Sequence, residues 1–207
     1  MRIGVFGGSF NPVHLGHLIA AECCREQAGL DRVVFVPAAV PPHKQDAALA
    51  AAEHRVEMLR LATGGHEAFA VSTAEIDRGG VSWTVETLAQ LAAERPEDRL
   101  HLILGPDALA QLPAWREPAR ILALAHLLTV ERDRLDDVAG ITADAALGGL
   151  LGPERLAAVL ATRVRMPAIG IRATDLRRTV AAGGSIRYRT PRAVERYIAA
   201  HGLYRDA

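Results

Sequence analysis

The chain lacks most of the features that mark secreted, membrane-bound or nucleic-acid-binding proteins. Its 207 residues include only two cysteines, Cys23 and Cys24, and adjacent cysteines rarely pair with each other. No apolar run approaches the roughly 20 residues that cross a bilayer, and the first residues lack the layout of a signal peptide. The 24 basic residues balance the 24 acidic ones, so the overall charge favours neither a nucleic acid nor an anionic membrane. We therefore expect a cytoplasmic protein with reduced thiols and no nucleic-acid or membrane partner.

Strand-like and helix-like stretches alternate along the whole chain. Short apolar stretches predict strands at 2–6, 33–37, 69–72, 100–104, 127–131 and 166–171. Helical periodicity predicts helices at 15–28, 54–63, 84–95, 117–125, 153–162, 174–183 and 190–202. This alternation predicts an α/β fold, a Rossmann-like open and mostly parallel sheet with helices on both faces. We expect one domain, 1–207, with a helical C-terminal part over about 172–207 and an irregular excursion over 132–152.

The opening stretch MRIGVFGGSFNPVHLGH gathers polar groups at the carboxyl end of the first predicted strand, where parallel sheets bind ligands. Gly7 and Gly8 allow a ligand to approach the backbone closely, and Ser9 offers a hydroxyl. His14 and His17 lie three residues apart at the start of a helix, whose N–H groups and dipole favour an anion. The stretch therefore predicts a phosphate site. The alternatives are a glycine turn with two surface histidines, or a zinc site whose further ligands the pattern does not supply.

GGSFNPVHLGH resembles the GxFxPxHxGH signature of the HIGH-motif nucleotidyltransferase superfamily. Further stretches resemble the family of bacterial nicotinate-nucleotide adenylyltransferases, namely FVPAAVPPHK, HRVEMLRLA, VSWTVETL, LILGPDALAQLPAW, ATDLR and VERYIAAHGLY. The resemblance implies a nucleotidyltransferase-type fold and the transfer of AMP from ATP to nicotinate mononucleotide, with release of pyrophosphate, in NAD biosynthesis. It also implies a substrate-bound Mg²⁺ and the small-molecule partners ATP and nicotinate mononucleotide. The sequence shows no set of residues that forms an all-protein metal site, which suits a metal held largely by substrate and water. The oligomeric state stays open, with a homo-oligomer as one alternative.

The same resemblance implies a role for each matching residue. His14 and His17 would be catalytic. The ATP and phosphate contacts would be Gly7, Gly8, Ser9, Phe10, Lys44, Asp107, Thr174 and Arg177, and the nicotinate nucleotide would contact Trp83, Thr84 and Trp115. Some of these assignments have a simpler alternative: a solvated lysine for Lys44, a helix-start carboxylate for Asp107, and core packing for the two tryptophans.

The chain departs from the family pattern near its C-terminus. Arg172 and Ala173 stand where the family has two serines, which puts hydroxyl contacts to the phosphates in doubt. We expect Thr174 to cap the following helix and Arg177 to lie in its first turn, where an arginine opposes the helix dipole unless an anion binds there.

Two further departures are milder. Asn11 replaces an aspartate, and Trp83 replaces a tyrosine.

Two alternative functions remain: an adenylyltransferase for nicotinamide mononucleotide or phosphopantetheine, and a nucleotide-binding regulator that has lost catalysis.

Overall fold

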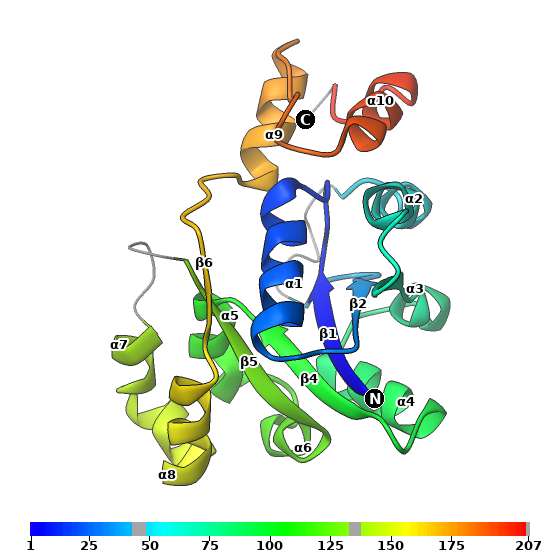
Figure 1. Ribbon diagram of the computed structural model, residues 1–207. Helices are drawn as coiled ribbons and strands as arrows, with labels where there is room; N and C mark the ends of the chain where they lie inside the picture. Colours follow the sequence, from blue (N-terminus) through cyan, green and yellow to red (C-terminus); the bar gives the residue numbers. More distant parts are fainter. Residues whose placement is uncertain (43–48, 133–137, 206–207) are drawn as a thin grey trace. The chain divides into compact units, whose positions relative to one another are not determined.

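A computed structural model describes residues 1–42, 49–132 and 138–205 of the chain. Within these ranges six strands form one parallel sheet in the order β3-β2-β1-β4-β5-β6. The strands are β1 (Arg2–Gly8), β2 (Arg32–Pro37), β3 (Phe69–Val71), β4 (Arg99–Leu104), β5 (Ala125–Arg132) and β6 (Val164–Met166). The predicted open, parallel α/β sheet is confirmed (Figure 1).

Helices connect these strands. In chain order they are α1 (Leu15–Gln27), α2 (Ala52–Thr63), α3 (Ala74–Arg78), α4 (Thr84–Glu94), α5 (Pro106–Gln111), the 3₁₀ turn η1 (Leu112–Ala114), α6 (Pro118–Leu124), α7 (Val138–Thr142), α8 (Ala145–Ala161), α9 (Ala173–Ala181) and α10 (Arg192–Ala200). No helix in the described ranges is long and apolar enough to cross a membrane.

The chain divides into two compact units. The first comprises Met1–Phe6, Ala20–Val33 and Trp83–Ala168, and the second comprises Gly7–Ile19, Val34–Ser82 and Ile169–Ala207. The rim of β1 and the start of α1, where the sequence predicts a phosphate site, lie in the second unit. Both tryptophans lie in the first unit.

In the first unit, β1, β4 and β5 run side by side (Figure 1). Their register pairs Ile3 with Leu100 and Leu102 with Leu127, so the apolar positions of neighbouring strands meet in one core. Gly4 lets this core pack closely, because a Cβ there would lie 2.7 Å from the end of the Leu30 side chain, which would have to move. This packing holds β4 in the core of the first unit, and Asp107 follows its carboxyl end.

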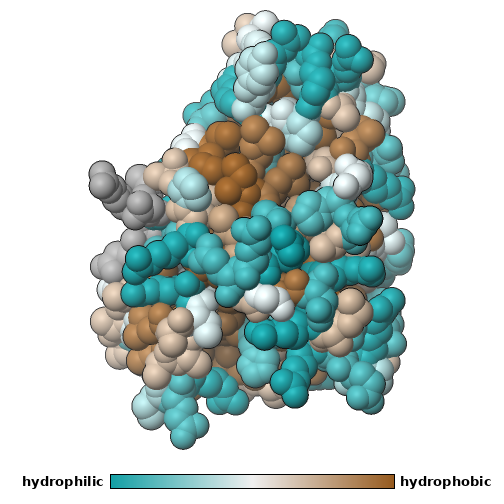
Figure 2. Space-filling view, viewed as in Figure 1, coloured by the Kyte–Doolittle hydropathy of each residue, from teal (hydrophilic) through white to brown (hydrophobic). Residues whose placement is uncertain are grey.

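In the second unit, apolar side chains support the loop that leaves β1. Phe10 and Phe35 are buried and meet edge to face, with ring centroids 5.8 Å apart. Met58 and Leu59 of α2 are also fully buried. In Figure 2 the visible face is largely hydrophilic, with an apolar area over the first turns of α1 and the segment that leads into α9. The start of α1 is therefore partly surrounded by apolar groups.

Two predictions for the segment after β5 are wrong. The strand expected at 166–171 is β6, which pairs with β5 only over Val164–Met166 and stops before Pro167, a residue without a backbone N–H. Residues 138–152 are mostly helical rather than irregular, since α7 and the first part of α8 cover all of them except 143–144. Asp144 caps α8 by accepting hydrogen bonds from the N–H groups of Ala146 and Leu147, and Gly152 with its positive φ kinks the helix.

Candidate active site

The loop–helix site, which we define as Gly7–His17 together with α9, contains the histidine pair. His14 immediately precedes α1, and its carbonyl accepts the N–H of His17 at 2.9 Å. The two imidazole rings stack, with centroids 3.7 Å apart and planes inclined by 20°. The two rings therefore lie side by side as predicted, although His14 lies one residue before the helix rather than in its first turn.

A hydrogen bond fixes the tautomer of His17. The backbone N–H of His14 donates to Nδ1 of His17 at 3.2 Å, so Nδ1 is an acceptor and the proton of the neutral ring lies on Nε2. Nδ1 of His14 is buried and has no partner among the described residues. An unpaired buried ring nitrogen is a group that a ligand can satisfy.

Both histidines are uncharged at neutral pH in the ligand-free chain. Burial lowers the pKa of His14 to about 4. Burial also lowers the pKa of His17 well below its usual range, and the nearby His14 lowers it further. A bound anion would oppose both effects, because it favours the protonated ring. The pair is therefore poised to donate hydrogen bonds or to take up a proton as negative charge arrives.

Small residues make this stack possible. A Cβ on Gly16 would lie 3.1 Å from the His14 ring, and a Cβ on Gly8 would lie 3.2 Å from the Phe10 ring. Phe10 has a positive φ of 44°, and its ring meets that of His17 at 5.1 Å. The side-chain position of Gly7 is open, with no atom within 4 Å. The loop therefore combines a rigid base with an accessible backbone.

The helix start offers less to an anion than the sequence suggests. The first helical N–H, that of Leu15, already donates to the carbonyl of Arg189 at 3.0 Å. The side chains of His14 and His17 then carry more of any phosphate contact than the helix N-terminus does.

Helix α9 begins one residue earlier than expected. Arg172 occupies the N-cap position without a side-chain cap, so the predicted cap by Thr174 is wrong, and Arg177 lies beyond the first turn. The cause is Ala173, a strong helix former that extends the helix toward its N-terminus. Arg177 instead donates to the backbone carbonyl of Asn11 at 2.8 Å, and its other nitrogen lies 3.5 Å from Oγ1 of Thr174. This contact brings Arg177 to the loop–helix site.

Arg55 of α2 is a site residue that the sequence reasoning missed. It is only 2% exposed, and its guanidinium donates to the carbonyls of Ser9 at 3.1 Å and Ala38 at 2.6 Å. It therefore supports the Gly8–Phe10 loop from behind. The only sequence signal was its place in the stretch HRVEMLRLA, which reads as an ordinary amphipathic helix.

The tryptophan cluster, defined as Trp83, Thr84, Trp115 and Arg116, lies in the first unit. Trp83 immediately precedes α4, and Thr84 is the first helical residue of a start without a side-chain cap. The Arg116 guanidinium lies 5.4 Å from the centre of the Trp83 ring and forms an ion pair with Glu86 at 2.9 Å. Nε1 of Trp115 is buried without a partner among the described residues. The cluster offers aromatic faces, a cation and helix N–H groups to a flat anionic ring.

Two predicted contacts remain to be placed. Asp107 is exposed in the first turn of α5, after Pro106 at the first helical position, as expected at the carboxyl end of β4. Lys44 lies outside the described residues. Its predicted phosphate contact stays a prediction, as do the roles of the other site residues.

Comparison with known proteins places the chain in a family. A family model described as cytidylyltransferase-like matches residues 5–179. The chain is 47% identical over 203 residues to a probable nicotinate-nucleotide adenylyltransferase of Roseiflexus sp. (strain RS-1), with 98% of each chain covered. It is 43% identical to a protein of the same name from Thermus thermophilus, with 99% of this chain and 100% of the relative covered.

Solved structures show the same fold. A Plasmodium falciparum nicotinic acid mononucleotide adenylyltransferase complexed with NaAD superposes with a TM-score of 0.74 at 14% identity, covering 99% of this chain and 97% of the other. The chain belongs to the cytidylyltransferase-like family of α/β proteins. Within that family it belongs with the nicotinate-nucleotide adenylyltransferases, which it matches over their full length.

Proposed function

We propose that the chain transfers AMP from ATP to nicotinate mononucleotide, which yields nicotinate adenine dinucleotide and pyrophosphate for NAD biosynthesis. The single observation that carries this proposal is the stacked, uncharged pair of a buried His14 and a half-buried His17 beside a glycine loop. The names of the full-length relatives support the same reaction.

The reaction needs alignment and charge stabilisation rather than a protein nucleophile. A phosphate oxygen of the mononucleotide attacks the α-phosphorus of ATP, and the bond from that phosphorus to the bridging oxygen of the β-phosphate breaks. Pyrophosphate leaves with the bond electrons. Both reactants are anions, so donors fixed before the reaction lower the barrier by holding the reacting atoms together and by stabilising the leaving group.

The histidine pair fits this task. Nε2–H of His17 is a donor of fixed orientation, because Nδ1 is held by the backbone of His14. His14 and His17 are neutral before ATP binds, so they do not repel each other, and the arriving negative charge raises their proton affinity. We infer that they donate hydrogen bonds to the α- and β-phosphates. These bonds would continue to stabilise the negative charge as it moves onto the leaving pyrophosphate.

Further groups would complete the proposed phosphate site. Gly7, Gly8, Ser9 and Phe10 would offer backbone and hydroxyl contacts, and Arg177 would bind the pyrophosphate end with its planar guanidinium. We further propose that Lys44 contacts the phosphates and that Asp107 accepts a hydrogen bond from a ribose hydroxyl, with Thr174 beside Arg177.

Imidazole and guanidinium donors fit phosphate oxygens better than they fit Mg²⁺, which prefers oxygen ligands. The described residues contain no group of three or more His, Cys, Asp or Glu side chains that could hold a metal. Mg²⁺ would therefore arrive coordinated by the ATP phosphates and water, and when bound it would neutralise phosphate charge.

The tryptophan cluster would bind the nicotinate ring. Trp83 and Trp115 would contact its faces, and the uncapped start of α4 at Thr84 would donate N–H groups to its carboxylate. The Arg116 cation already lies near the Trp83 ring, which favours a negatively charged substituent on the pyridine.

Pyrophosphate release from ATP, measured with three acceptors, tests this proposal. Nicotinate mononucleotide should support turnover best, ahead of nicotinamide mononucleotide and phosphopantetheine. A protein that binds ATP but releases pyrophosphate with none of the three would be a nucleotide-binding regulator. Preference for either of the other acceptors would keep the chemistry and overturn the substrate assignment.

A further inference from the structure

The guanidinium of Arg55 is a buried charge held by neutral groups. Besides Ser9 and Ala38, it donates to the carbonyls of Ala50 at 2.9 Å and Ala39 at 3.3 Å. These acceptors satisfy its hydrogen bonds without neutralising its charge. The four carbonyls belong to three backbone segments, so Arg55 also ties the glycine loop to the segment after β2 and to the start of α2.

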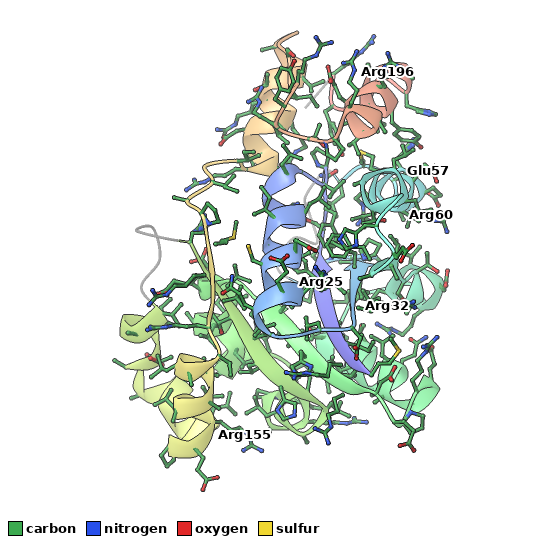
Figure 3. All side chains as sticks on the ribbon, viewed as in Figure 1. Arg25, Arg32, Glu57, Arg60, Arg155 and Arg196 are labelled. Carbon is green, nitrogen blue, oxygen red and sulfur yellow. The ribbon has the colours of Figure 1, made fainter. Side chains whose placement is uncertain are left out.

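The hydrogen bonds of Arg55 within the described part of the chain all go to backbone carbonyls rather than to a carboxylate. Burial lowers the pKa of Arg55 more than the nearby Tyr204 and Glu53 raise it, which reflects the cost of a desolvated cation. Two other charged residues of α2, Glu57 and Arg60, lie on the outer side of the helix and approach each other to 3.8 Å (Figure 3). The exposed arginine of this helix therefore has a close counter-ion, whereas the buried one is held by neutral acceptors.

Within the described part of the chain, the groups that contact Asn11 beside Arg55 are uncharged or positive, whereas Glu53 of the same helix is a carboxylate near the Arg55 guanidinium. Oδ1 of Asn11 accepts hydrogen bonds from the N–H of Ala50 at 3.1 Å and from the hydroxyl of Tyr204 at 2.8 Å. These two bonds fix the amide, and its Nδ2 has no partner among the described residues. Burial raises the pKa of Tyr204, while Arg177 and Arg55 act on it in the opposite direction, so both cations lie close to this phenol.

We propose that Arg55 is a positioning residue whose missing counter-ion is the polyphosphate of the bound nucleotide, and that Asn11, by being neutral, keeps Arg55 and Arg177 available to that anion. Arg55 lies behind Ser9 and acts through the loop. In this low-dielectric setting a full charge acts over several ångströms with little screening. The inference rests on the proposed function, since it takes ATP as the ligand.

The decisive variant is Asn11→Asp. It keeps an acceptor for Ala50 and Tyr204 and adds a carboxylate beside the Tyr204 hydroxyl, on which both guanidiniums act, and these cations will hold the carboxylate in its charged form. The added charge should stabilise the ligand-free fold and weaken the binding of ATP and of pyrophosphate by about tenfold, because it competes for the same cations. A purely structural role for Arg55 predicts no loss of polyphosphate affinity.

Arg60→Gln is the matched control. It changes the net charge by the same amount, and it removes the exposed cation of the same helix, whose side chain is 61% exposed. Its affinity for ATP should equal that of the native chain. A loss as large as that of Asn11→Asp would mean that net charge alone controls binding, and would overturn the inference.

A second pair of variants separates charge from shape at position 55. Arg55→Lys retains the cation and should keep ATP affinity within about threefold, although it loses the planar fork. Arg55→Met removes the cation and should lose about tenfold or more. Chemical denaturation of each variant reports its stability, so the comparison of Lys with Met holds even if both folds are weakened.

Calorimetric titration with ATP and with inorganic pyrophosphate, without an acceptor, provides the measurement. Weaker binding together with a higher denaturation midpoint for Asn11→Asp is the expected result. Equal affinities of the native chain and Asn11→Asp, or of Arg55→Lys and Arg55→Met, would overturn this inference but leave the proposed function standing. A native chain that binds neither ligand would overturn the proposed function as well.

Discussion

The low pKa of His14 makes the stability of the fold depend on pH in a way that one substitution can isolate. In the unfolded chain this ring has its ordinary pKa of 6.5, and in the folded chain burial lowers the pKa to about 4. Between these values the unfolded chain binds a proton that the folded chain does not, so acid favours unfolding. The stabilisation is present above pH 6.5 and is lost as the pH falls toward 4.

The magnitude follows from the size of the shift. A difference of 6.5 − 4 = 2.5 pKa units corresponds to about 3.4 kcal/mol when fully expressed. Integration of the proton-binding difference between pH 7 and pH 5 gives a loss of about 2 kcal/mol from His14 alone. His14 is 7% exposed, so solvent screening reduces this value little.

Urea denaturation of the native chain and of His14→Gln, each at pH 7 and pH 5, measures the effect. The native chain should lose about 2 kcal/mol more than the variant over this interval, since glutamine does not titrate. His201→Gln, which changes an exposed histidine, should lose as much stability between pH 7 and pH 5 as the native chain does. Saturating pyrophosphate should reduce the native loss, because a bound anion raises the pKa of the ring. Identical losses in the native chain and His14→Gln would refute the assignment of a buried, neutral His14.

Three further predictions concern catalysis. His17→Ala should lower kcat by about 10²-fold while the protein stays folded, since one fixed donor to the developing charge is removed; kinetics with circular dichroism checks this, and near-native kcat would contradict it. Arg177→Lys should impair ATP use and Arg177→Ala should impair it more, with little change in direct titration of nicotinate mononucleotide; unchanged ATP kinetics would make α9 purely structural. The kcat/KM for nicotinate mononucleotide should exceed that for nicotinamide mononucleotide by about tenfold, and Trp83→Ala should raise the KM for nicotinate mononucleotide about fivefold. Equal kcat/KM for the two acceptors, with an unchanged KM in Trp83→Ala, would show that the tryptophan cluster does not bind the substrate.

The local parts of the fold and site follow from the sequence. The apolar strand, the glycine turn and the histidine spacing are signals within one short segment, so β1, α1 and the His14–His17 stack are predictable. Asp144 is an N-cap residue type that favours a helix start after it, but the glycines and the proline within 148–153 disfavour a helix, so the sequence predicts α8 only from 153 onward. Ala173 extends α9 by a helix propensity that competes with the cap preference of Thr174.

The remaining parts depend on contacts between distant segments. The hydroxyl of Tyr204 binds an amide 193 residues away, and Arg177 binds a carbonyl 166 residues away. No periodicity or motif encodes these pairs. A buried arginine such as Arg55 is also hidden from pattern reasoning, because arginine in an amphipathic helix is normally exposed. Its role emerges only from the carbonyls that surround it.

The most direct test of the account follows the oxygen atoms of the phosphate in nicotinate mononucleotide. When that phosphate carries ¹⁸O and ATP is unlabelled, direct attack on the α-phosphorus predicts that all the label appears in nicotinate adenine dinucleotide, part of it in the bridge between the two phosphorus atoms, and that the pyrophosphate carries none. Mass spectrometry of both products after incubation with the enzyme and Mg²⁺ measures this distribution. Label in the pyrophosphate, or consumption of ATP without formation of the dinucleotide, would contradict the account.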